Sequence, residues 1–305
     1  MYRKQAAQTQ TYTPTETKTL NRAILHSKFG NLTSETTRLN LACSQIVTLE
    51  PDTFAGLTHL DTLFLRNNKI AHLRAGSLLG LVNLKEIDFY NNQIEKLDAG
   101  AFEGCENLRI LAMSTNKLTD LDGPMFNFLN NLEILELFYN QISTLKPNVF
   151  NALANIRTIH LHGNQIFDVD AQVFQRLPNL VTIRLSGNRL TKLDARVFKG
   201  LKRVREIDLS HNDLFELAPD QFEGCDALEE LAIANNQLTQ LPDKIFKVFL
   251  KWIILKSPLK IFFRRTINII LLKSTKTRLC CWETQFNLNP KKVLSDEFLE
   301  SSFSI

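Results

Sequence analysis

A period of 24 residues, which holds from Thr37 to Lys247, constrains the fold of this chain more than any other feature. Eight complete units and the start of a ninth follow one another without insertion. Two of them read DTLFLRNNKIAHLRAGSLLGLVNL (61–84) and KEIDFYNNQIEKLDAGAFEGCENL (85–108). A repeat of this length is a structural unit that buries its apolar face only against its neighbours. The sequence therefore predicts a solenoid of about nine units over residues 37–247.

Each unit opens with alternating apolar residues, as at Leu63 and Leu65 or at Ile183 and Leu185. Such alternation indicates a strand that buries one face. Because the strand recurs in the same register at a fixed interval, we expect one strand per coil and a parallel sheet.

An asparagine follows the strand in every unit except the first, which has Ser44. Its amide group both donates and accepts hydrogen bonds. At a turn inside the coil it can satisfy the buried backbone groups of its own and the next unit. The predicted structural ladder consists of Asn68, Asn92, Asn116, Asn140, Asn164, Asn188, Asn212 and Asn236.

A later position of the unit is nearly always phenylalanine, with Leu78 as the exception, and predicts a buried stack of rings. Such rings bury about 150–250 Å² each. Cys105 and Cys225 stand where other units carry leucine, and we interpret them as small buried hydrophobic residues. The phenylalanines are Phe54, Phe102, Phe126, Phe150, Phe174, Phe198, Phe222 and Phe246.

The pattern LxxLxLxxNxLxxLxxxxFxxLxx resembles the typical 24-residue leucine-rich repeat of animal extracellular proteins, which include Toll-like receptor ectodomains and secreted or adhesive relatives. The resemblance covers about two thirds of the chain. It implies an α/β repeat solenoid: a curved horseshoe with a concave parallel β-sheet and short turns or half-helices on the convex side. It also implies a binding module of a receptor, adhesion or innate-immune protein, at the cell surface or secreted.

Enzymatic motifs are absent from the sequence, which has no GxSxG, P-loop, HExxH or GxGxxG signature. We therefore expect a non-enzymatic protein without cofactor or metal, which recognises a protein ligand or co-receptor. A structural spacer, a homo-oligomer and an intracellular adaptor are the alternatives.

The outward side chains of the strands form three columns on the concave sheet, where a partner would touch. Large apolar groups exposed in units two to five indicate an interaction surface, although curvature or homodimer packing could shield them. The expected partner-binding residues are Phe64, Arg66, Glu86, Asp88, Tyr90, Ile110, Ile134, Glu136, Phe138, Tyr139, His160, His162 and Arg184.

His160 and His162 lie two residues apart on the same face, beside Glu136. Such a group could hold a metal or sense pH, but Arg184 argues against a cation, and ordinary polar sheet residues are the favoured interpretation. A basic run in units seven and eight is interpreted as a solvated surface. It consists of Arg189, Lys192, Arg196, Lys199, Lys202, Arg203 and Arg205.

The net charge of +4 is unevenly distributed, with +3 over 1–36, −5 over 37–247 and +6 over 248–305. A nucleic-acid-binding protein usually concentrates basic charge on its folded domain, so no nucleic-acid partner is expected.

The two ends differ from the repeats. We expect a disordered N-terminal segment over 1–28, because its first 20 residues are polar, and a partial cap over 29–36. Asn31 begins the only N-glycosylation sequon, and no signal peptide is visible. Residues 248–305 form an atypical basic and apolar tail, interpreted as translated intron, with a membrane-surface helix as the alternative. Membrane attachment would come only from this tail or from a missing C-terminal region.

Overall fold

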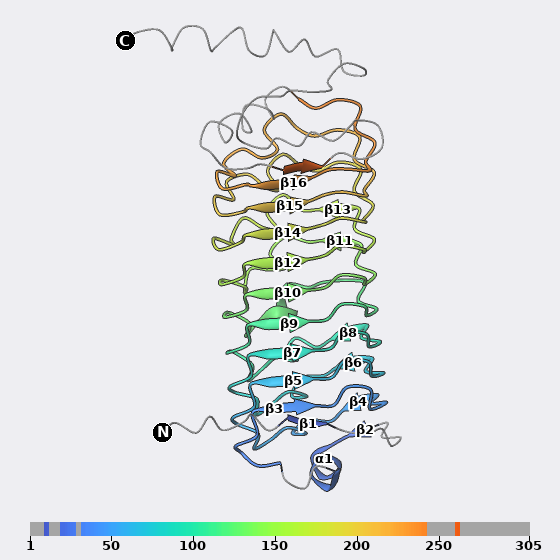
Figure 1. Ribbon diagram of the computed structural model, residues 1–305, viewed down its shortest axis with the longest axis vertical. Helices are drawn as coiled ribbons and strands as arrows, with labels where there is room; N and C mark the ends of the chain where they lie inside the picture. Colours follow the sequence, from blue (N-terminus) through green and yellow to red (C-terminus); the bar gives the residue numbers. More distant parts are fainter. Residues whose placement is uncertain (1–8, 12–18, 29–31, 243–259, 263–305) are drawn as a thin grey trace, which may run out of the picture.

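Each coil contributes one three-residue strand to a single parallel sheet (Figure 1). The computed structural model describes residues 9–11, 19–28, 32–242 and 260–262. The strands, in their order across the sheet, are β1 (Thr9–Thr11), β3 (Arg38–Asn40), β5 (Thr62–Phe64), β7 (Glu86–Asp88), β9 (Ile110–Ala112), β10 (Ile134–Glu136), β12 (Thr158–His160), β14 (Thr182–Arg184), β15 (Glu206–Asp208), β16 (Glu230–Ala232) and β17 (Lys260–Phe262).

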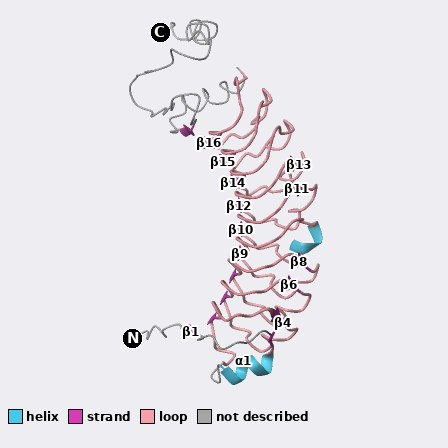
Figure 2. Ribbon diagram, turned by 90° about the vertical axis from the view of Figure 1, so that its right-hand side faces the viewer, coloured by secondary structure: helices cyan, strands magenta, loops and turns pink. Residues whose placement is uncertain are grey.

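The register of the sheet follows the sequence period. From β3 to β16, every residue of a strand pairs with the residue 24 positions further along, so that Leu63, Ile87 and Leu111 lie in one row. Figure 2 shows that the stack curves, with this sheet along its inner, concave side. The predicted horseshoe with a concave parallel sheet is confirmed.

The rest of each coil is mostly turn. Pairs of two-residue parallel strands lie away from the large sheet, and one 3-10 helix, Gly123–Phe126, interrupts the turns. The pairs are β2 (Thr19–Leu20) with β4 (Thr48–Leu49), β6 (His72–Leu73) with β8 (Lys96–Leu97), and β11 (Thr144–Leu145) with β13 (Asp168–Val169). The short turns predicted for the convex side are therefore present.

One apolar core runs through the described coils and contains the predicted phenylalanine stack. The seven described phenylalanines of the stack are at most 2% exposed. The rings of Phe150, Phe174 and Phe198 follow one another at centroid distances of 6.2 Å, with interplanar angles of 8° and 9°. Leu78 and both cysteines, Cys105 and Cys225, are also fully buried. Phe246 lies outside the described residues.

The asparagine ladder ties each coil to its predecessor. Nδ2 of Asn164 donates to the carbonyl oxygens of Leu137 (2.9 Å) and Leu161 (3.0 Å), and its Oδ1 accepts from the backbone N–H of Ile142 (3.1 Å). The other ladder asparagines repeat this pattern, and all except Asn236 are buried. The asparagines satisfy buried backbone groups of two coils, but the second coil is the preceding one and not the next one that the sequence suggested.

The N-terminal segment differs from the expectation of disorder over 1–28. Residues 19–28 contain β2 and the helix α1 (Arg22–Lys28), which lies at the end of the stack (Figure 1). Asn21 Oδ1 accepts the backbone N–H of Ile24 at 2.9 Å, as an N-cap residue does. Leu20 and Leu25 are buried in the core and close the first coil. In the sequence, an N-cap asparagine, Asn21, followed by the apolar pair Ile24-Leu25 indicates this helix, although the polar composition of the segment suggested disorder.

Several expectations for the ends fall on residues outside the described ranges, including Asn31 and nearly all of the tail 248–305. The described residues 32–36 of the expected cap form a turn, which buries Leu32. In the tail, only β17 is described, and its backbone pairs with β16. None of the described helices has the length and apolar character needed to cross a membrane.

Candidate binding face

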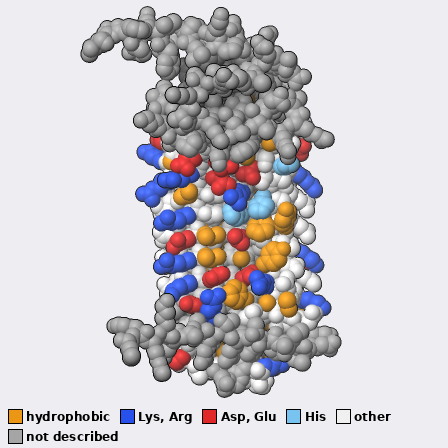
Figure 3. Space-filling view, in the orientation of Figure 1, with side chains coloured by type: hydrophobic (Ala, Val, Ile, Leu, Met, Phe, Trp, Pro, Cys, Tyr) orange, Lys and Arg blue, Asp and Glu red, His pale blue; other side chains and the backbone are white. Residues whose placement is uncertain are grey.

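The concave face presents three columns of side chains, as the repeat period predicts. Within the first column Glu86, Ile110 and Ile134 are register partners, and within the second Asp88 is followed by Ala112 and Glu136. Strand neighbours are about 4.7–4.9 Å apart. Figure 3 shows hydrophobic and acidic side chains side by side in the middle of this face, with histidines above them.

An aromatic cluster occupies the third column and the adjoining turn. The rings of Phe138 and His162 stack at 4.5 Å between centroids, with an interplanar angle of 9°. Tyr139 packs edge-on against both rings at 5.7 Å. We call Phe138, Tyr139 and His162 the aromatic cluster. Its three rings come from two neighbouring coils and form an apolar surface on the otherwise polar concave face.

Tyr139 combines high exposure with an unfavourable backbone conformation. Its side chain is 60% exposed, and its φ of 52° lies in the left-handed region, which bulky residues rarely adopt. Asn67, Asn91 and Gly187 occupy the equivalent position in other coils and share the positive φ. A Cβ atom at Gly163 would overlap the tyrosine ring, so the glycine of the next coil makes room for it. The positive φ recurs at this turn in every described coil, also at Cys43, Thr115 and His211, so the exposed ring and not the backbone distinguishes Tyr139.

Phe64 lies apart from this cluster. The guanidinium carbons of Arg38 and Arg66 are 5.6 and 5.9 Å from the centroid of its ring. No ring contact between described residues joins Phe64 to Tyr90 or Phe138. Two arginine side chains thus lie near the ring of Phe64, which makes no ring contact with the aromatic cluster among the described residues.

The two histidines are held neutral by their surroundings. Burial, followed by the charge of Arg184, lowers the pKa of His160 to about 4 and also lowers the pKa of His162. Nδ1 of His160 is 3.9 Å from Oε1 of Glu136. Within the described ranges, no group of three or more His, Cys, Asp or Glu residues could hold a metal ion. His160 and His162 thus lie beside Glu136 as the sequence suggests, and both imidazole rings are uncharged near pH 7.

Arg184 is engaged within the sheet. Its Nε donates to Oε1 of Glu206 in the next coil at 2.7 Å, and this hydrogen bond is the main reason that its pKa is raised. Glu136 behaves differently, because burial and the charge of Asp88 raise the pKa of its carboxyl group. The face thus has a paired cation at one end and carboxylates without a basic partner near its middle.

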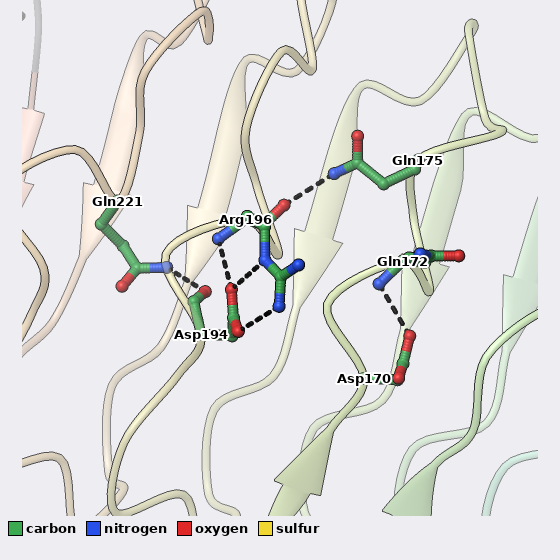
Figure 4. Close-up of polar contacts among 6 residues, drawn as sticks. All are labelled: Asp170, Gln172, Gln175, Asp194, Arg196 and Gln221. Carbon is green, nitrogen blue, oxygen red and sulfur yellow. Dashed lines mark hydrogen bonds and ion pairs between the residues drawn. The ribbon is translucent and has the colours of Figure 1, made fainter.

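The basic run predicted to be solvated is largely engaged in local contacts. Figure 4 shows Arg196, which donates from Nε and Nη2 to the carboxylate of Asp194 at 2.9 and 2.8 Å. These hydrogen bonds lower the pKa of Asp194 to about 2. Gln175 and Gln221 reach across coils to the backbone carbonyls of Arg196 and Asp194. Lys199 and Arg205 likewise form ion pairs, with Glu223 and Glu229, and these paired cations remain exposed at the surface.

A second asparagine series was not predicted. In five coils an asparagine near the end of the unit donates to a backbone carbonyl 25 residues earlier, at 2.8–3.2 Å. Its recurrence at the period of 24 was the signal that could have revealed it. Its members are Asn83, Asn107, Asn131, Asn155 and Asn179.

Solved structures share the solenoid. A leucine-rich repeat protein of Leptospira interrogans is 26% identical, with a TM-score of 0.62, over 75% of this chain and 62% of that chain. TLR13, solved as a complex with ssRNA13, is 24% identical (TM-score 0.66, 73% of this chain, 34% of that chain). Toll, from the Toll–Spatzle complex of Drosophila, is 22% identical (TM-score 0.65, 76% and 30%).

The chain spans less than two thirds of the length of each of these three chains. At 24 and 22% identity, TLR13 and Toll show the fold alone. Because the TLR13 structure is a complex with single-stranded RNA, the exclusion of nucleic acid on the basis of charge is not supported.

No curated protein matches the sequence. A family description, leucine rich repeat, matches at residues 34–88, 60–118, 84–142, 106–166 and 154–214. These overlapping matches cover more than half of the chain and coincide with the coils of the structure. The chain therefore belongs to the leucine-rich repeat family.

Proposed function

We propose that this protein is a non-enzymatic recognition module that binds a protein partner on the concave face of its coils, as part of an extracellular or cell-surface protein. The observation that carries the proposal is the aromatic cluster. Aromatic side chains are enriched among the residues that dominate binding energy. Tyr139 is 60% exposed, and it stands at a turn position where no other described coil has a phenylalanine, tyrosine or tryptophan.

The Toll–Spatzle complex supports a protein partner for this fold. In TLR13, however, the fold occurs in a complex with single-stranded RNA. The described concave columns of this chain contain six acidic residues and three arginines. Phosphate binding depends on basic side chains, so this balance favours a protein surface over a nucleic acid. The acidic residues are Glu86, Asp88, Glu136, Glu206, Asp208 and Glu230, and the basic ones are Arg38, Arg66 and Arg184.

Replacement of Tyr139 by asparagine tests the proposal. Relief of the left-handed strain gains about 1–2 kcal/mol, and loss of the ring contacts costs about 0.5–1.5 kcal/mol. The free energy of unfolding should thus change by less than about 1 kcal/mol. Affinity for the native partner, identified by cross-linking on cells of the source and measured with purified components, should fall by tenfold or more.

Phe167→Ala is the matched control, because Phe167 is similarly exposed, at 57%, but lies outside the three concave columns. Equal affinity of the wild type and Tyr139→Asn for the partner would refute the concave site. If both variants weaken binding alike, the contact surface lies elsewhere on the coils.

The cellular location has its own test. An extracellular protein should carry a glycan at Asn31, which peptide mass spectrometry of material from the native source detects. A bare Asn31 together with peptides from the tail 248–305 would favour the intracellular adaptor and contradict the translated-intron interpretation.

A further inference from the structure

The coil that contains β9 has small side chains at two of its three outward positions, Ala112 and Ser114. The coils on either side carry larger groups there. Asp88 and Glu136 flank Ala112 as register partners. Tyr90 and Phe138 flank Ser114, as shown by the hydrogen bonds from Asn91 N–H to Ser114 O and from Thr115 N–H to Phe138 O. We call these six residues the notch: Asp88, Tyr90, Ala112, Ser114, Glu136 and Phe138.

The two carboxylates of the notch are electrostatically coupled and have no basic partner. No ion pair between described residues joins Asp88 or Glu136 to a lysine or arginine, and the carboxylate of Asp88 accepts the backbone N–H of Tyr90. His160, 3.9 Å from Glu136, is neutral near pH 7, because burial lowers its pKa to about 4. Their backbones are two strand spacings apart, about 9–10 Å. The charge of Asp88 already opposes ionisation of Glu136 by raising its pKa.

Ser114 provides an independent indication of a missing ligand. The residue is 0% exposed, and its Oγ has no hydrogen-bond partner. A buried hydroxyl without a partner costs about 1–3 kcal/mol. A hydroxyl oxygen accepts hydrogen bonds from N–H groups, so an entering donor would remove this penalty.

We infer that the notch binds a cationic side chain of the partner protein, and that arginine fits it best. The guanidinium group donates to carboxylates on both sides and packs its planar faces against Tyr90 and Phe138. Because Ser114 is 0% exposed, an N–H group reaches its Oγ only after a covering side chain turns aside. The chain already contains this kind of packing one coil away, where Arg38 and Arg66 lie over Phe64. The inference rests on the proposed function, because it names the chemistry of the ligand on the same face.

The flanking groups are compatible with this ligand. Ile110 and Ile134, half-buried in the first column beside the carboxylates, offer apolar surface to the methylene groups of an arginine. Arg66 is the nearest cation in the third column, but it is turned over the ring of Phe64. A metal ion is a poorer occupant, since the notch supplies only two carboxylates and no metal-binding group exists among the described residues.

Methyl NMR on the full chain tests the inference with Nα-acetyl-L-arginine methylamide as the probe. The resonances of Ala112, Ile110 and Ile134 should shift in a saturable manner. The Ala101 methyl group serves as an internal reference, because it is 0% exposed in the core and lies outside the three concave columns. The neutral isostere Nα-acetyl-L-citrulline methylamide should cause no saturable shift.

Two variants and a control locate the binding. Asp88→Asn with Glu136→Gln keeps the shape and removes the charge, and should weaken arginine binding by tenfold or more. Ala112→Val fills the floor of the notch and should abolish the shifts, without a change in unfolding temperature, because β-branched residues suit strands. Glu230→Gln, the matched control on the same face, should bind as the wild type does.

Several outcomes would overturn the inference. These are an absence of shifts in the wild type, equal binding of citrulline, and unchanged binding in Asp88→Asn/Glu136→Gln. A single-stranded RNA that shifts the same methyl groups, when arginine does not, would assign the face to nucleic acid. If the arginine probe does not bind but Tyr139→Asn still weakens binding of the partner protein, only this inference is wrong. If arginine binds but Tyr139→Asn keeps the partner, the notch stands and the proposed concave site fails.

Discussion

At the scale of the residue, hydrogen-bond satisfaction explains why asparagine recurs at one position of the repeat. Each ladder amide serves three buried backbone groups that belong to two coils, as Asn164 does for Leu137, Leu161 and Ile142. An aspartate has no N–H group, and a serine is too short to serve both coils. In the first unit, the hydroxyl group of Ser44 donates to the carbonyl oxygen of Ala42 in its own coil. The side chain therefore acts as a link between coils as well as a turn residue.

Asn164→Ala should lower the free energy of unfolding by about 2–4 kcal/mol, because it leaves three buried backbone groups without partners. Urea denaturation measures this loss. The matched control is Asn155→Ala, which removes one exposed hydrogen bond, to the carbonyl of Asn130 at 2.9 Å, and should cost less than about 1 kcal/mol. Similar losses in the two variants would contradict the distinction between the buried and the exposed series.

At the scale of the element, the coil is too thin to possess a core of its own, and it is stabilised by stacking on its neighbours. The phenylalanine stack shows this dependence. The ring of Phe174 touches those of Phe150 and Phe198, which belong to the preceding and following coils. Leu78 keeps the interior closed in the one described coil that has no ring there. This position of the repeat thus requires a large apolar side chain that fills the interior, which is a phenylalanine in most coils.

Phe174→Ala should destabilise the protein by about 3–5 kcal/mol, since it opens a cavity between two coils. Differential scanning calorimetry and urea denaturation measure the effect. Phe167→Ala, in the same coil but 57% exposed, is the control and should change stability by less than about 1 kcal/mol. A loss at Phe174 no larger than that at Phe167 would show that the stack does not support the fold.

At the scale of the whole molecule, the stacked coils create a partly dry concave face from residues that are distant in sequence. His160 has only 16% of its side chain exposed there and lies beside Glu136. The charges of Arg184 and His162 further oppose its protonation, whereas Glu206 favours it. No single coil would produce this environment, because four coils contribute to it.

The depressed pKa of His160 makes stability depend on pH. The unfolded chain binds this proton near pH 6.5 and the folded protein only near pH 4, so stability falls as the pH decreases between these values. The loss by pH 5 should be about 1–2 kcal/mol. His160→Gln should remove it, as shown by urea denaturation at pH 7 and pH 5.

The raised pKa of Glu136 acts in the opposite direction, because the folded protein then binds a proton more readily than the unfolded chain. The informative quantity is therefore the difference between the wild type and His160→Gln. A wild type and a His160→Gln variant with identical pH profiles would contradict the proposed burial of this ring.

The sequence by itself determined the solenoid, its register, the phenylalanine stack and the asparagine ladder. Core positions must satisfy the same packing and hydrogen bonds in every coil, so they recur every 24 residues and can be read from the chain. The tertiary structure alone decided how the outward residues combine. Two arginine side chains lie near the ring of Phe64, Phe138 stacks on His162, and Asp88 and Glu136 flank Ala112. These arrangements depend on side-chain conformation, curvature and neighbours one coil away, and residues free of core packing carry no repeat from which to predict them.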